Sequence, residues 1–168
     1  MAPVGKTRDA GYQIGVSTTL DVPAEAVLRV LAGARGQECW LGAGARLELE
    51  VGAAFRAADG STGEVRGLGR GERIRVRRHW PDGRWTTQQV AVGRRGARTV
   101  MVLHEEGLAS GEERELRRDH WRAVARELVR LAEKEAARGA GTEECGPVRR
   151  SPHGAGHNAA PWSAREAG

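Results

Sequence analysis

The sequence predicts an α+β domain in which a long C-terminal helix covers a curved antiparallel sheet of about six to seven strands. Two observations support this prediction. Apolar residues recur with helical spacing between Ser110 and Ala137, and short runs separated by turn residues fill the chain from Arg46 up to that helix. A long helix with one apolar face must bury that face against another layer. We expect the order strand, two short helices, strands and long helix.

The first strand is predicted over residues 11–20, where apolar or β-branched side chains alternate with smaller polar residues and glycine. Asp21 is the expected N-cap of the next helix, with Pro23 in its first turn and Gly33 at its end. The segment GQECWLG, residues 36–42, predicts a second, shorter helix that directs its Trp and Leu toward the interior.

Turn residues then divide the chain into runs of about six to nine residues, which is typical of an antiparallel meander. These turns are Gly52, Asp59-Gly60, Gly69 to Gly71, Pro81 to Gly83 and Gly93 to Gly96. In WPDGRW, Pro81 fixes φ and Gly83 can take a positive φ, which predicts a hairpin tip flanked by Trp80 and Trp85. The last strand is predicted from Thr99 to Glu105.

One strand of this meander, ERIRVRRHW, carries a charge on its apolar side. Ile74, Val76, Arg78 and Trp80 share one face, and Arg73, Arg75, Arg77 and His79 share the other. Arg78 is therefore predicted to point toward the interior, where a charge needs a partner.

The long helix has sequence signals at both ends. Ser110 and Glu113 form a capping box, and Gly139 supplies a stop. Its broad apolar face is predicted to contain Leu116, His120, Trp121, Val124, Leu128 and Leu131, and the opposite, solvated face contains Arg118, Arg122, Arg126 and Arg130.

The 168 residues, 39% hydrophobic and 29% charged, suffice for one domain with a core. We assign residues 1–10 to an N-terminal extension, 11–138 to the domain and 139–168 to a disordered tail. The tail is rich in Gly, Ala, Pro, Ser and Arg and has no apolar periodicity, so it buries too little apolar surface to offset its ordering entropy.

The formal net charge is +5, and 25 of the 27 cationic residues are arginine. These arginines are scattered, which indicates a solvated surface, and no stacking motif supports nucleic-acid binding. No segment approaches the roughly 18 apolar residues of a membrane span, and the N-terminus lacks the apolar region of a signal peptide. Cys39 and Cys145 have no disulfide or zinc spacing. A cytoplasmic protein is expected.

Four segments, in this order and spacing, resemble the SRPBCC or START-like superfamily, in the group related to the activator of heat-shock protein 90 ATPase. They are GKTRDAGYQIGVSTTLDVPAEAV, WLG at 40–42, ERIRVRRHW at 72–80, and LHEEGLASGEERELRRDHWRAVARELVRL. The resemblance spans about residues 4 to 136. It implies a helix-grip fold, with a cavity between the sheet and the C-terminal helix. It also implies hydrophobic-ligand binding in some members, cyclase or aromatase chemistry in a few and chaperone assistance in others, without any catalytic motif to transfer.

Large aromatic and soft side chains are the candidate lining of this cavity. They are Trp40, Phe55, Trp80, Trp85, Met101 and Trp121. Together they would form an apolar pocket whose indole N–H groups orient an aromatic or acyl ligand. The alternative is ordinary core packing, because a chain with one Phe and one Tyr needs tryptophan to fill volume.

Three polar residues on the apolar side are the candidate anchors of a ligand: Arg78, Arg117 and His120, the last beside Trp121 and Val124. Either arginine would hold a carboxylated or phenolic ligand. The alternative is that Arg117 extends its guanidinium to water at the helix end and that Arg78 pairs with a carboxylate such as Glu105.

No metal or cofactor site is expected. His104, Glu105 and Glu106 are consecutive in a strand, so His104 and Glu105 point to opposite faces and do not form one cluster with His120. The H-x3-H spacing of His153 and His157, near Cys145, lies in the glycine-rich tail and is interpreted as accidental. Motifs of hydrolases, P-loop proteins and dinucleotide-binding enzymes are absent from the sequence.

The sequence therefore predicts non-catalytic binding of a small hydrophobic or aromatic molecule between sheet and helix. Two alternatives stay open. A chaperone-associated interaction protein would act through its outer face, and its partner would still bind after cavity-filling substitutions. A cyclase or dehydratase would use His120 as a base, so that His120→Ala abolishes turnover while ligand affinity stays.

Overall fold

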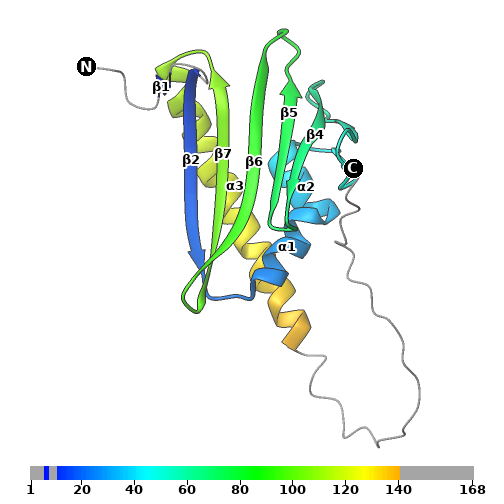
Figure 1. Cartoon of the computed structure of the whole chain (residues 1–168), viewed down its shortest axis with the longest axis vertical. Coiled ribbons are helices and arrows are strands. Elements are labelled where there is room, and N and C mark those ends of the chain that lie inside the picture. Colours follow the sequence, from blue (N-terminus) through cyan, green and yellow to red (C-terminus); the bar gives the residue numbers. More distant parts are fainter. Residues whose placement is uncertain (1–5, 8–10, 141–168) are drawn as a thin grey trace, which may run out of the picture.

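The computed structural model describes residues 6–7 and 11–140 of the chain. Seven antiparallel strands form one sheet in the order β1-β2-β7-β6-β5-β4-β3 (Figure 1). The elements are β1 Lys6–Thr7, β2 Gly11–Leu20, α1 Ala24–Ala32, α2 Ala34–Leu41, β3 Ala54–Arg56, β4 Thr62–Gly69, β5 Arg73–His79, β6 Trp85–Arg95, β7 Arg98–Leu108 and α3 Gly111–Ala140.

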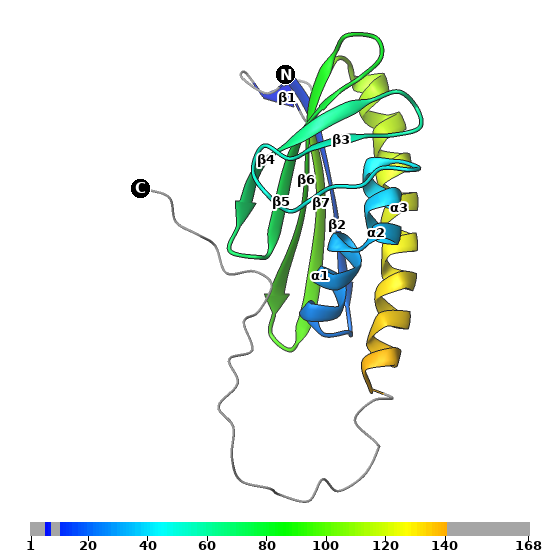
Figure 2. The same cartoon turned by 90° about the vertical axis from the view of Figure 1, so that its right-hand side faces the viewer.

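All three helices lie on one side of the curved sheet, with α3 running along it as a separate layer (Figures 1 and 2). The predicted α+β helix-grip architecture is confirmed. The residues of α3 that face the sheet, Trp121, Val124, Ala125, Leu128 and Ala132, recur every three or four positions and are buried. The core between the layers also contains inward-facing residues of the long strands β2, β6 and β7.

The predicted apolar face of α3 is correct in its middle and wrong at its start. Leu116 is 67% exposed, and His120 is exposed as well. Both residues precede Trp121, where α3 first buries a side chain completely. No helix within residues 6–7 and 11–140 has the length and apolar character that crossing a bilayer requires.

The start of α1 differs from the prediction. Pro23, not Asp21, is the N-cap residue, and it offers no side-chain hydrogen bond to the helix. Asp21 instead accepts hydrogen bonds from the Arg98 guanidinium at 2.7 and 3.1 Å, which connects the end of β2 to the start of β7.

Residues 46–51 form no strand, contrary to the meander prediction. The buried side chain of Gln37 takes the place of a neighbouring strand there. Its Oε1 accepts from the Leu47 N–H at 2.9 Å, and its Nε2 donates to the Leu47 carbonyl at 2.8 Å. Gly93 is also not a turn residue. It lies inside β6, and the turn to β7 is at Gly96, with φ of +61°.

The hairpin between β5 and β6 and the start of α3 follow the prediction. Gly83 has φ of +86°, and its N–H donates to the Trp80 carbonyl at 2.9 Å. Ser110 Oγ accepts from the Glu113 N–H at 3.1 Å, while the Glu113 carboxylate accepts from the Ala109 N–H at 2.6 Å. In the usual capping box the glutamate accepts from the N–H of the N-cap residue itself. Here Glu113 accepts from the preceding residue, Ala109, so the motif is shifted by one position.

Two elements of the structure lie at the predicted domain limits. Two residues of the N-terminal extension form β1, which pairs with β2. At the other end α3 passes the expected stop at Gly139 and includes Ala140. The rest of the predicted disordered tail, with Cys145, His153 and His157, lies outside the described residues.

Candidate functional site

A cluster of polar side chains is buried where the β5–β6 hairpin meets the first half of α3. Arg78 comes from β5, Gln88 from β6 and Glu105 from β7, and their exposed fractions are 3%, 0% and 0%. The alternation of each strand directs these side chains to the helix-covered face. With Trp80, Arg117, His120 and Trp121 they form what we call the hairpin–helix site.

Glu105 is the centre of this site. One carboxylate oxygen accepts from Arg117 Nε at 2.6 Å and from Trp121 Nε1 at 2.8 Å, and the other accepts from Gln88 Nε2 at 3.1 Å. Burial alone would raise the pKa of Glu105, but the Arg117 charge and these three hydrogen bonds outweigh it and lower the pKa. Glu105 is therefore an ionised carboxylate inside the core.

Arg78 pairs with a carboxylate other than the one expected. Its Nη2 donates to Asp59 at 2.8 Å and to Ser61 Oγ at 2.7 Å, whereas Glu105 pairs with Arg117. Burial lowers the pKa of Arg78, and Asp59 opposes that shift. The guanidinium also lies 4.1 Å from the centre of the Trp80 ring. Gly42, in the WLG segment beside Arg78, has φ of +110°, a backbone conformation that favours glycine.

Arg117 does not extend to water, as the alternative interpretation had it. Its side chain is 17% exposed, and its guanidinium lies 5.3 Å from the Trp80 ring centre and 5.7 Å from the Trp121 ring centre. This packing is a cation–π arrangement between two indoles. The helix therefore places Arg117 between the hairpin and the core.

Two buried polar atoms of the site have no hydrogen-bond partner among the described residues, Gln88 Oε1 and Arg117 Nη2. The Gln88 amide has only one sensible orientation, because its N–H group must face the Glu105 carboxylate. Its oxygen is thus an unused acceptor, and Arg117 Nη2 is an unused donor. Leaving such a group unsatisfied costs about 1–3 kcal/mol.

His120 lies at the rim of the site, in contact with Trp121. Its side chain is exposed, yet burial, followed by the positive charge of Arg117, lowers the pKa of the imidazole to about 4. The exposed surface and the lowered pKa are compatible, because solvent reaches part of the ring while the surrounding protein displaces much of the water around it. The imidazole contacts Trp121 edge-on, with ring centres 5.6 Å apart. At neutral pH His120 is uncharged.

This pKa predicts that acidification destabilises the protein before its carboxylates titrate. Unfolded His120 takes up a proton near pH 6.5, whereas the folded imidazole resists protonation until about pH 4. Unfolding free energy should therefore fall as pH decreases from 6.5 to 4, and His120→Gln should flatten this decline. Urea denaturation at several pH values measures it. His104→Gln is the control, and an equally flattened profile for that variant would contradict the assignment.

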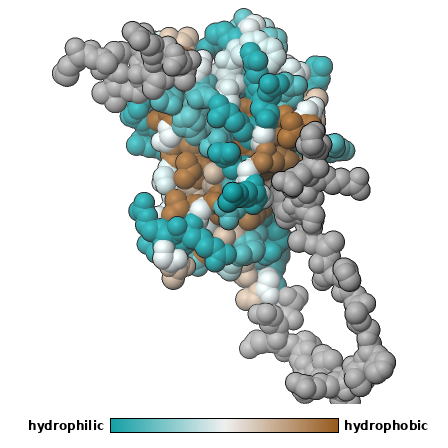
Figure 3. All heavy atoms as spheres, in the orientation of Figure 1, coloured by the Kyte–Doolittle hydropathy of each residue, from teal (hydrophilic) through white to brown (hydrophobic). Residues whose placement is uncertain are grey.

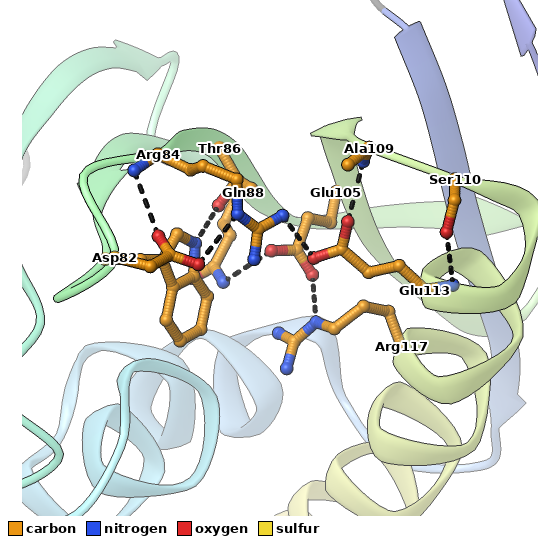
Figure 4. A network of polar contacts seen from close by, with 10 residues as sticks. Asp82, Arg84, Thr86, Gln88, Glu105, Ala109, Ser110, Glu113 and Arg117 are labelled. Atoms are coloured by element: carbon orange, nitrogen blue, oxygen red, sulfur yellow. Dashed lines mark hydrogen bonds and ion pairs between the residues drawn. The ribbon is translucent and has the colours of Figure 1, made fainter.

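A bridge at the surface closes the site at the hairpin end. Arg84 Nε donates to Asp82 at 2.8 Å, within the hairpin, and its Nη1 donates to Glu113 at 2.7 Å, in the first turn of α3. Figure 4 shows the Arg84 guanidinium between these two carboxylates. The Arg84 bridge thus joins the β5–β6 hairpin to the first turn of α3.

The predicted aromatic lining separates into three groups. Trp40, Phe55, Met101 and Trp121 are at most 4% exposed and Val124 is 7% exposed, so these side chains are packed in the core. The Trp40 indole N–H donates to the Leu31 carbonyl at 3.1 Å. Trp80 is half-buried at the site. Trp85 pairs with His79 on the opposite face of the sheet, so its placement toward the helix was wrong.

Sequence reasoning missed Gln88, Asp59 and Ser61 as members or supports of the site. A signal for Gln88 exists, since it alternates in phase with Val90 and Val92 in TTQQVAV and is therefore directed to the core. Asp59 and Ser61 lie in the turn before β4, and only the folding of the chain brings them to Arg78.

Cys39, for which the sequence predicts no disulfide, is a free thiol.

Solved structures share this fold at low sequence identity. Protein MLL2253 from Mesorhizobium loti is 16% identical with a TM-score of 0.62, and the match covers 73% of this chain and 97% of that one. CalU16 from Micromonospora echinospora is 14% identical with a TM-score of 0.60, covering 79% and 90% of the two chains. The Aha1 dimer from Colwellia psychrerythraea is 13% identical with a TM-score of 0.57, covering 69% and 92%.

No protein-family model matches this sequence, and no curated protein matches it. At these identities the solved structures establish the fold alone. They confirm the helix-grip fold that the resemblance stated above implies.

Proposed function

We propose that the hairpin–helix site binds a small apolar molecule, such as an aromatic one, through a single uncharged hydroxyl or amide group. The observation that carries this proposal is the pair of unpartnered buried atoms, Gln88 Oε1 and Arg117 Nη2. A hydroxyl group has the chemistry that both atoms need, because it can donate to the glutamine oxygen and accept from the guanidinium. The ligand's apolar part would lie against Trp80 and His120 at the rim.

The charge of the site favours an uncharged ligand group. Arg117 is neutralised by Glu105 and Arg78 by Asp59, and His120 is uncharged at neutral pH. A ligand carboxylate would meet the Glu105 carboxylate and an amide oxygen without a free cation to compensate its desolvation. Of a carboxylated and a phenolic ligand, the phenolic one therefore fits the charges of this site.

Ligand entry requires a local opening, because the two unpartnered atoms have no accessible surface in the closed structure. We infer that the Arg84 bridge, which joins hairpin and helix at the surface, parts to admit the ligand. Arg84 is 43% exposed at its side chain, and exposed ion pairs contribute only about 0–1 kcal/mol. Breaking this ion pair therefore costs little free energy. Hydrogen bonds from the ligand to the two polar atoms would favour the liganded state.

The two other functions remain less well supported. A cyclase or dehydratase that uses His120 as a base needs a pKa near the working pH, and an imidazole with a pKa of about 4 is a weak base. A chaperone-associated role concerns the outer face of the sheet and leaves the buried polar cluster unexplained. Ligand binding accounts for that cluster directly.

Calorimetric titration with 4-phenylphenol and with biphenyl-4-carboxylate tests the proposal. We expect the phenol to bind about tenfold more tightly than the carboxylate, as one satisfied hydrogen-bond pair implies. Gln88→Met should remove this preference. Gln89→Met, on the outer face of the same strand, is the matched control. Equal binding of both compounds, or an equal effect of both substitutions, would contradict the proposal. Native mass spectrometry of the purified protein searches for a co-purified molecule of this class.

A further inference from the structure

The outer face of the sheet, which none of the helices among the described residues covers, contains an exposed tryptophan. Trp85 is 47% exposed. Its ring lies 4.5 Å from the centre of the His79 ring and 4.5 Å from the Arg77 guanidinium. These neighbours hold the indole in place, so it is a preordered apolar surface and not a mobile side chain. Preordered Trp and Arg side chains are the residues most enriched in binding hot spots.

Two grooves meet at Trp85. The larger, of about 670 Å³, extends toward the β3 edge of the sheet, and its lining includes Arg56, Thr62, Glu64 and Trp85. The smaller, of about 430 Å³, extends toward β7, and its lining includes Arg77, Trp85, Thr87 and Glu106. A chain segment that crosses Trp85 would occupy both.

The strand register aligns cationic side chains along this path. Arg56, Thr62, His79 and Trp85 are successive cross-strand neighbours on β3, β4, β5 and β6. In the next row Arg77 lies opposite Thr87 and Glu64. A ligand that follows these rows from Trp85 toward β3 would therefore meet the positive charges of Arg77 and Arg56.

The cations of this face exceed its carboxylates. Arg56, Arg66, Arg73, Arg75 and Arg77 are exposed on β3 to β5. Glu64 pairs with Arg66, and Glu106 pairs with Arg75. In the part of the chain that the structure describes, no carboxylate forms an ion pair with the other three arginines. These three are therefore available to an acidic partner.

Apolar side chains continue the face beyond the arginines. Val100, Val102 and Ala91 are half-buried on the outer side of β6 and β7. Figure 3, which views this side of the sheet, shows hydrophobic residues over its middle with hydrophilic residues around them. A partner thus meets an apolar centre beside a cationic margin, the arrangement of a protein-binding surface.

We propose that the outer face of β3 to β6 binds an extended acidic segment of another protein, with an apolar side chain of that segment against Trp85. Charge complementarity selects this occupant. A second copy of the chain would place the same unpaired arginines against each other. A nucleic acid would have to stack on a ring already flanked by His79 and Arg77, beside Glu64 and Glu106. A membrane surface requires protruding apolar side chains, whereas Val100 and Val102 are half-buried.

Fluorescence anisotropy with a labelled peptide of glutamates around two phenylalanines tests this surface. We expect binding that weakens as salt rises, since exposed charges are screened. Arg56→Ala combined with Arg77→Ala should weaken binding about tenfold, and Trp85→Ala should weaken it about as much. The matched control is Arg122→Ala combined with Arg126→Ala, which removes the same charge from the exposed side of α3 and should leave affinity nearly unchanged.

Four outcomes would overturn the proposal. They are absence of binding at low salt, equal losses in the two double variants, tighter binding of an oligothymidylate than of the peptide, and tighter binding of phosphatidylserine vesicles. Circular dichroism verifies that each variant is folded. Gln88→Met should leave peptide binding unchanged, so this test is independent of the ligand proposed for the hairpin–helix site.

Discussion

Glu105→Ala should lower the free energy of unfolding by about 3–5 kcal/mol, the usual cost of removing one partner of a buried ion pair. The carboxylate is completely buried and accepts from Arg117, Trp121 and Gln88. Its removal leaves a cation without its partner and two buried N–H groups without an acceptor. Guanidinium denaturation, followed by tryptophan fluorescence and by circular dichroism, measures the change.

Glu106→Ala is the matched control, since the next residue lies on the opposite face of the same strand and pairs with Arg75 near the surface. It should cost about 0–1 kcal/mol. Adding Arg117→Met to Glu105→Ala should recover part of the loss, because the uncompensated charge disappears. If both glutamates cost the same, or if the second substitution adds a further full loss, Glu105 and Arg117 do not form the buried pair described above.

Trp121→Ala should cost about 3–5 kcal/mol as well, through a different mechanism. The indole is completely buried under the sheet, so its truncation removes apolar contacts and leaves a cavity. It also deprives Glu105 of one donor. The measurement is the midpoint of guanidinium denaturation at pH 7.

Leu116→Ala, five residues earlier on the same helix, provides the comparison. Leu116 is 67% exposed, so its truncation should change stability by less than about 0.5 kcal/mol. A large loss for this variant, or a small one for Trp121→Ala, would mean that α3 presents another face to the sheet.

The elements that the sequence predicts well are those with local signals. The alternation in β2, the Pro-Asp-Gly turn and the capping box of α3 each depend on a few neighbouring residues. The run 46–51 has comparable signals, yet the side chain of Gln37 occupies its pairing edge. The pattern of residues 46–51 does not reveal this contact, because Gln37 lies ten residues before Leu47 in the sequence.

The site illustrates the same limit. The strand and helix periodicity alone predicts that Arg78 and Arg117 point inward. Their carboxylate partners, Asp59 and Glu105, are determined only by how the folded chain packs. Trp85 shows how one step of register matters. Trp80 and Trp85 both flank the turn, yet the pairing of His79 with Trp85 directs this indole outward. His79 was expected on the outer face, and residues paired across two strands share a face. Identifying Trp85 as the partner of His79 across the turn would therefore have predicted an outward indole.

Nuclear magnetic resonance of the indole N–H groups during titration with 4-phenylphenol tests the ligand proposal most directly. Trp121 donates to Glu105 and Trp80 lies beside Arg117, so their signals should shift together as the phenol binds. Trp40, whose indole donates to Leu31, and Trp85, on the outer face, should stay unchanged. Shifts confined to Trp85, or no shift at saturating phenol, would show that the hairpin–helix site does not hold the ligand.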